Sequence, residues 1–283
     1  MTSENNSTTV HVQSWFIPID ILNMICCIIA IILALVFLFV IIFDKTYQTV
    51  GMMLVTNSCI AELIFGSDLL AMGYISYMSV GLQNYSYLLQ AIYRYILIVY
   101  PSRLFYQSFK FQTFLISITW ICCIIYPIPL VFTGQIKYLV DDQICQMPLQ
   151  LSFLTIFNAI YIYLYPMLSI ILIYLKMVQY VHEMRKHITP VNRLFHARRD
   201  LRMIRRIVSL VFILIALGFP YQTFIIMSFF NIAPKYHFRI AFMFIDVSLV
   251  FVLIALLEIT EPLKTSLMKR ITVQSTNITR TVT

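Results

Sequence analysis

Charge is scarce in this sequence. Only 11% of the 283 residues are charged, whereas soluble domains carry about 25%. Hydrophobic residues make up 60% of the chain, and the mean hydropathy is +0.86. A soluble protein of this length cannot bury so much apolar surface. The composition therefore predicts a protein that crosses a lipid bilayer several times.

Positive charge is missing at the start of the chain. The first 18 residues contain no lysine or arginine, so no basic region precedes the first apolar run. A cleaved signal peptide has such a region, and we therefore expect the first span to act as an uncleaved signal. The net charge of +8 does not indicate nucleic-acid binding, because the basic residues are concentrated in loops between apolar spans.

Motifs for catalysis and metal binding are absent as well. The sequence has no His-Glu-x-x-His, no Gly-x-Ser-x-Gly and no paired intramembrane aspartates. Of the six cysteines, Cys145 alone lies in a polar loop, which gives no support for a disulfide framework or a zinc site. With only six glycines and no internal repeat, a transporter is also disfavoured. We expect no enzyme, no cofactor and no metal.

Seven apolar segments have the length of membrane-spanning helices, which need roughly 20 residues. Polar turns and basic runs separate them. The sequence therefore predicts an all-α fold, a bundle of seven transmembrane helices. In chain order the segments are 21–43, about 47–67, 69–99, 111–133, about 152–175, 207–230 and about 238–257.

Lysine and arginine set the expected orientation of this bundle. Seven spans put the two termini on opposite sides of the membrane. If the N-terminus is outside, all but three of the 20 Lys and Arg residues lie on the inner side. The positive-inside rule therefore predicts an outside N-terminus and a cytoplasmic C-terminus. Overlapping glycosylation sequons at Asn5 and Asn6 then lie on the outer side.

The spans carry a series of markers in a typical order. The markers are Glu62 in Asn57–Leu63, Arg94 in Ala91–Pro101, Trp120 before Pro127 and Pro129, Pro166 eight residues before Tyr174, and Phe219-Pro220-Tyr221. In this order the chain resembles the rhodopsin-like family of G-protein-coupled receptors over nearly all of its length. The resemblance implies a multi-pass glycoprotein of the plasma membrane, with an extracellular ligand and a heterotrimeric G-protein as partners. It divides the chain into an extracellular segment 1–18, a receptor domain 19–268 and a cytoplasmic tail 269–283.

The chain departs from the family pattern in four places. Tyr93 replaces the acidic residue that the family has before the arginine, and Gly218 stands where the family usually has tryptophan. Glu261-Pro262 occupies the place of the asparagine–proline pair of the seventh helix, without the tyrosine that follows it. The family's cysteine near the outer end of the third helix is missing, so we expect its loop partner, Cys145, to be a free thiol or to pair between chains.

The interval between Glu62 and Arg94 is short. It holds 31 residues, which just suffices to finish one span, turn and cross the bilayer, and relative to the family it lacks roughly 20 residues. Two explanations remain open: a receptor with a tight first outer loop, or a truncated form of a longer receptor. The abrupt change at Gly66–Leu69 favours truncation.

The resemblance implies a switch role for Arg94 at the inner end of the third span, with Tyr174 nearby. Asp200 lies 20 residues before Pro220, which is about 30 Å along the same helix. An ion pair of Arg94 with Asp200 would hold the inactive state; the alternative is a solvated Asp200. The mid-span carboxylate of Glu62 marks a polar site, either a sodium site as in the family or a protonated, hydrogen-bonded group.

Polar residues in the outer halves of the third, fifth and sixth spans are the expected ligand contacts. Ser76 stands where amine receptors of the family have an aspartate, and no acidic residue lies between Asp68 and Arg94. A monoamine is therefore disfavoured, and a peptide or another small ligand is expected, with Asp246 among the acidic residues that attract a basic peptide. The alternative function is a non-signalling or truncated receptor-like protein, a decoy or heterodimer partner. The expected contacts are Ser76, Tyr77, Asn158, Tyr221 and Gln222.

Overall fold

A computed structural model describes most of the receptor-like region. The described residues are 16–43, 49–67, 73–139, 144–147, 152–186, 218–220, 222–224, 226–230, 232, 234 and 237–259. Predictions on Asn5, Asn6, Asp200, Tyr221, Glu261-Pro262 and the C-terminal tail therefore lie outside the described residues.

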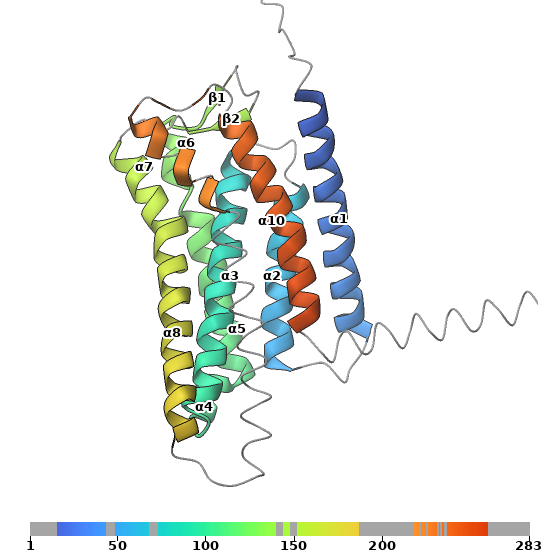
Figure 1. Ribbon diagram of the computed structural model, residues 1–283, viewed down its shortest axis with the longest axis vertical. Helices are drawn as coiled ribbons and strands as arrows, with labels where there is room; N and C mark the ends of the chain where they lie inside the picture. Colours follow the sequence, from blue (N-terminus) through green and yellow to red (C-terminus); the bar gives the residue numbers. More distant parts are fainter. Residues whose placement is uncertain are drawn as a thin grey trace, which may run out of the picture.

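Long helices run side by side in a bundle (Figure 1). One end carries a short antiparallel hairpin, which we call the hairpin end; the opposite end carries α4, and we call it the α4 end. The helices are α1 (Phe16–Phe43), α2 (Val50–Ser67), α3 (Gly73–Val99), α4 (Leu104–Gln107), α5 (Phe109–Ile125), α6 (Ile128–Phe132), α7 (Phe153–Asn158), the π-helix η2 (Ala159–Leu164), α8 (Tyr165–Lys186) and α10 (His237–Ile259), and the strands are β1 (Lys137–Leu139) and β2 (Ile144–Gln146).

Three helical stretches are long and apolar enough to cross a membrane, namely Ile17–Phe39, Phe109–Phe132 and Phe153–Tyr180. Two shorter apolar stretches, Val50–Ala61 and Ile240–Ile254, lie in α2 and α10. These helices agree in position with the expected spans, and they establish a helical membrane protein. The predicted 69–99 span is also helical, from Gly73 to Val99.

The hairpin is the part of the fold that the expected all-α architecture omits. β1 pairs with β2 in antiparallel register, with Tyr138 opposite Cys145. Before β1, Gly134 has a φ of 63°, a conformation that glycine adopts without steric cost, and it turns the chain from α6 into the hairpin. Three residues per strand are too few for an alternating pattern to stand out in the sequence.

Apolar side chains of five helices form the main core. α1 packs against α2 and α10, and α3 packs against α2, α5 and α8. Fully buried residues from these helices meet in one cluster, among them Phe37, Cys59, Ala91, Met177 and Leu249. Outward-facing positions of α1, α5 and α8 are instead rich in exposed Leu, Ile and Phe, which suits contact with lipid tails.

A buried polar network ties α2, α3 and α5 together. Asn57 donates from Nδ2 to Ser86 Oγ at 2.7 Å, and Trp120 Nε1 donates to Asn57 Oδ1 at 2.8 Å. Nearby, Gln90 Nε2 donates to Ser58 Oγ at 2.5 Å. Because no water competes in the bilayer interior, such bonds fix which faces of the helices meet.

Asn57→Leu is expected to lower the melting temperature of the purified protein by about 2–14 °C. The change removes two interhelical hydrogen bonds worth about 0.6–1.7 kcal/mol each, and each kcal/mol shifts Tm by roughly 2–4 °C at this size. Thr119→Val is the control, since among the described residues its hydroxyl bonds to Leu115 O of its own helix and to no other helix. Equal Tm values for the two variants in a thermal unfolding assay would contradict the expected stabilisation by these interhelical hydrogen bonds.

Candidate functional site

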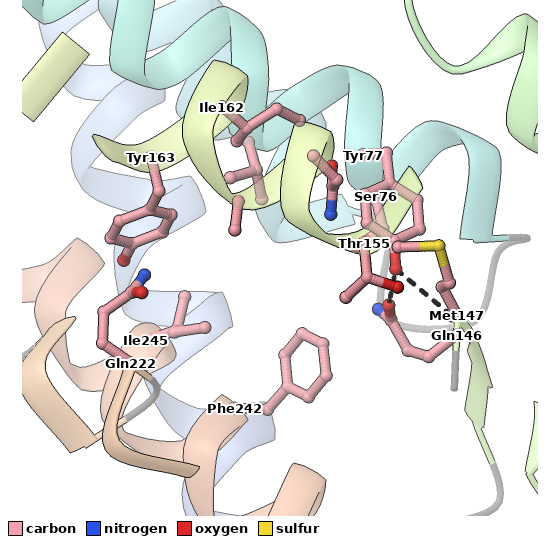
Figure 2. Close-up of a pocket in the computed structure, with 13 residues that line it drawn as sticks. Ser76, Tyr77, Gln146, Met147, Thr155, Ile162, Tyr163, Gln222, Phe242 and Ile245 are labelled. Carbon is pink, nitrogen blue, oxygen red and sulfur yellow. Dashed lines mark hydrogen bonds between the residues drawn. The ribbon is translucent and has the colours of Figure 1, made fainter. Parts of the chain in front are cut away.

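A pocket opens near the hairpin end of the bundle, between α3, the chain after β2, the α7–η2 segment, residue 222 and α10 (Figure 2). Four of the five predicted ligand contacts line it: Ser76, Tyr77, Asn158 and Gln222. The fifth, Tyr221, lies outside the described residues. The structure thus brings together side chains that are up to 146 positions apart in the sequence.

Tyr77 anchors the hairpin over this pocket. Its hydroxyl donates to Gln146 Oε1 at 2.7 Å and accepts from the backbone N–H of Met147 at 3.2 Å. Tyr77, Gln146 and Met147 are all buried. The dashed lines in Figure 2 show these two bonds converging on one oxygen. Sequence reasoning found Tyr77 but missed its partners, because they lie at the end of a three-residue strand and just after it, where the sequence has no regular pattern.

The π-helix η2 forms the part of the pocket wall that packs against α3. Pro166 has no N–H and cannot bond to the carbonyl four residues before it, that of Ile162. Asn84 of α3 supplies the missing donor, because its Nδ2 lies 3.0 Å from Ile162 O. Tyr85 donates in the same way to Tyr161 O at 3.0 Å. These two bonds give the carbonyl oxygens of the π-helical turn hydrogen-bond donors. π-Helical turns are frequent at functional sites.

The surroundings of Gly218 explain why glycine stands where the family usually has tryptophan. A Cβ placed on Gly218 would lie 3.0 Å from Tyr163 Oη. The ring of Tyr163 therefore already occupies the space beside position 218. A tryptophan there would require Tyr163, a wall of the pocket, to move.

Gln222 contributes a buried side-chain donor to the pocket. Its Nε2 is buried yet has no hydrogen-bond partner among the described residues. In Figure 2 its amide faces Tyr163 across one end of the pocket. A buried donor without a partner costs about 1–3 kcal/mol.

Arg94 lies toward the α4 end of the bundle, where it meets α8. The Arg94 guanidinium donates a side-chain hydrogen bond to the hydroxyl of Tyr174, which is buried. Two of the three predicted switch residues are thus in contact, and the third, Asp200, lies outside the described residues. The ring of Tyr93 turns toward α2, with Cε1 3.7 Å from the place of a Cβ on Gly51.

Two expectations about acidic residues can be compared with the structure. Asp246 was expected to attract a basic peptide at the outer surface, and this is wrong. It is buried within the bundle on α10, where the Cys27 thiol of α1 donates a hydrogen bond to it. Glu62 lies in α2, but its side chain is outside the part of the chain that is described.

Cys145 is exposed and forms no disulfide with another cysteine of the chain, which agrees with both predicted alternatives, a free thiol and a pair between chains. Even so, the hairpin rests directly on the first residue of α3. A Cβ on Gly73 would lie 2.6 Å from Cys145 O and 2.7 Å from Ile136 Cγ2. Close packing and the Tyr77 bonds hold the hairpin where the family pattern has a disulfide.

Comparison with known proteins agrees with this arrangement. The family model of the seven-transmembrane receptors of the rhodopsin family matches residues 46–258. No curated protein matches the chain. The match covers most of the sequence, and the chain belongs to the rhodopsin family of seven-transmembrane receptors.

Proposed function

We propose that this protein is a G-protein-coupled receptor of the plasma membrane, with seven spans, an outside N-terminus that is glycosylated at Asn5 or Asn6, and a cytoplasmic C-terminus. An extracellular ligand binds in the pocket at the hairpin end. A heterotrimeric G-protein docks at the α4 end, around Arg94 and Tyr174.

One observation carries this proposal: α3 contributes to both sites. Ser76 lines the pocket and Arg94 contacts Tyr174, and the two are 18 residues apart on one uninterrupted helix. Eighteen residues span about 27 Å, close to the hydrocarbon thickness of about 30 Å. α8 follows η2 without a break and carries Tyr174, so a second helix also joins the pocket to the α4 end.

The contact that Arg94 makes suggests which residue restrains the receptor in its resting state. With tyrosine at position 93 in place of an acid, the described contact of Arg94 is the neutral hydroxyl of Tyr174. A neutral hydrogen bond holds a guanidinium less tightly than a carboxylate does. We therefore propose that Asp200 supplies the resting-state restraint, and that its loss raises basal signalling. We also propose that the Glu62 carboxyl stays inside the bundle as a protonated group or a sodium ligand.

A second reading is a receptor-like protein that does not signal, either a truncated form or a heterodimer partner. The short connection favours it, since only positions 68–72 lie between the end of α2 at Ser67 and the start of α3 at Gly73. The free Cys145 is consistent with the same reading.

Recruitment of G-protein α subunits separates the two readings. The full chain is expressed at the cell surface with a panel of labelled α subunits, next to an established receptor of the rhodopsin family. We expect recruitment of at least one α subunit above that of cells without the receptor. No recruitment of any subunit, at surface expression equal to that of the control receptor, would favour the non-signalling reading.

A further inference from the structure

The described lining of the pocket has no charged group to pair with a charged ligand. Among the lining residues that the structure describes, every polar side chain is a serine, threonine, tyrosine, asparagine or glutamine. Burying an ammonium or a carboxylate without an opposite charge is costly, because the ion loses its hydration. This composition favours an uncharged ligand group.

Several of the polar atoms in the pocket are already engaged. Tyr77 bonds Gln146 and Met147, as described above. Thr155 Oγ1 shares a hydrogen bond with Ser152 Oγ at 2.8 Å. Asn158 Oδ1 accepts from the hydroxyl of Tyr126. Gln222 Nε2 is a buried donor without a partner among the described residues, so a ligand group that enters should present an acceptor to it.

The size of the enclosed space limits that group. Its volume is about 50 Å³, whereas a cavity of about 150 Å³ is known to bind benzene. A planar head of a few heavy atoms fits, and an aromatic ring does not. The remainder of the ligand must extend toward the mouth of the pocket, past apolar side chains such as Phe242 and Ile245.

We propose that the pocket binds the uncharged carbonyl head group of a small ligand, such as a carboxamide, whose oxygen accepts a hydrogen bond from Gln222 Nε2. This inference rests on the proposed function in so far as the same pocket is the ligand site of the receptor. It adds the chemical class of the ligand and the residue that selects it.

The first test needs no ligand. Gln222→Leu removes a buried donor that has no partner among the described residues, so it is expected to raise the Tm of the unliganded protein by about 2–12 °C. Gln90→Leu is the matched control, because Gln90 is buried and bonded to Ser58. That variant is expected to lower Tm. A lower Tm for Gln222→Leu as well would contradict an unused donor at position 222.

The second test uses three probes with one carbon chain: hexanamide, hexylamine and hexanoate. Thermal shifts are measured on the full chain purified in detergent, at millimolar concentrations that suit small ligands. We expect hexanamide alone to raise Tm, by about 2 °C or more at tenfold excess over its Kd. The shift should disappear in Gln222→Leu and persist in Thr223→Val, whose hydroxyl donates to Phe219 O of the preceding helical turn.

A reversed preference gives the sharpest outcome. Gln222→Glu replaces the donor with a carboxylate and is expected to lose the hexanamide shift and gain one with hexylamine. The proposal is overturned if hexanamide shifts Gln222→Leu as much as the unchanged protein. It is also overturned if hexylamine or hexanoate matches hexanamide on the unchanged protein, or if none of the three shifts it.

Thermal shifts report binding without a G-protein, which keeps the two proposals separate. Hexanamide binding that depends on Gln222, in a protein that recruits no α subunit, would refute receptor signalling and leave the ligand class intact. Recruitment of an α subunit with no Gln222-dependent binding would refute the ligand class and leave receptor signalling intact.

Discussion

Replacing Arg94 with glutamine is expected to reduce recruitment of the G-protein α subunit about tenfold or more, because a hydrogen bond to a charged group contributes about 1.5–3 kcal/mol. Glutamine keeps a polar, flexible side chain and hydrogen-bond donors but has no charge. Arg94 is only half-buried in α3, so the fold should tolerate the change. Surface expression and Tm are expected to stay close to those of the unchanged protein.

Tyr174 provides the partner for a double-mutant cycle with Arg94. Tyr174→Phe removes the hydroxyl that Arg94 contacts and leaves the ring in the core. If the two residues act together, the double variant should lose less recruitment than the two single losses combined. Tyr180→Phe, on the same helix, is the control. Full recruitment by Arg94→Gln, or additive losses in the cycle, would contradict the proposed pairing.

Gly73→Ala is expected to lower Tm by about 2 °C or more, since overpacking costs typically about 1–3 kcal/mol and each kcal/mol is worth roughly 2–4 °C. A Cβ there would lie 2.6 Å from Cys145 O and 2.7 Å from Ile136 Cγ2. Both neighbours belong to the hairpin region, so the hairpin must lift. That movement pulls Gln146 and Met147 away from Tyr77 and opens the pocket. The hexanamide shift should weaken with it.

Gly81→Ala is the matched control on the same helix. A Cβ at Gly81 would make ordinary contacts, 3.6 Å from Cys123 Sγ and 3.8 Å from Ile162 Cδ1. The gain in helix propensity over glycine then applies without a clash. We expect Tm to stay the same or rise. If both variants have the same Tm, the hairpin does not rest on Gly73 as described.

Spacing along single helices could be predicted from the sequence. Counting back from Arg94 placed Ser76 and Tyr77 near the opposite end of the third span, and both line the pocket. This works because α3 is one unbroken helix from Gly73 to Val99. The markers also gave the family correctly, since their order depends only on the chain.

Contacts between distant segments could not be predicted in the same way. Tyr77 and Gln146 are joined by a hydrogen bond across 69 positions, and nothing in the loop sequence indicates it. Asp246 was placed at the outer surface because an almost wholly apolar helix does not reveal which face meets its neighbours. In a membrane both lipid and helix contacts are apolar, so the helical hydrophobic pattern that marks a buried face in soluble proteins is weak.

Because non-covalent contacts hold the hairpin, its attachment should not depend on reducing or oxidising conditions. A hairpin fixed by a disulfide is released by reductants, and its attachment then depends on the redox state of the surroundings. Here the hairpin is held by the Tyr77 bonds and by contact at Gly73, and none of the six cysteines, all of them in the described part of the chain, forms a disulfide. Dithiothreitol should therefore leave the pocket and its cover intact, and an oxidising compartment is not needed for this part of the protein to fold.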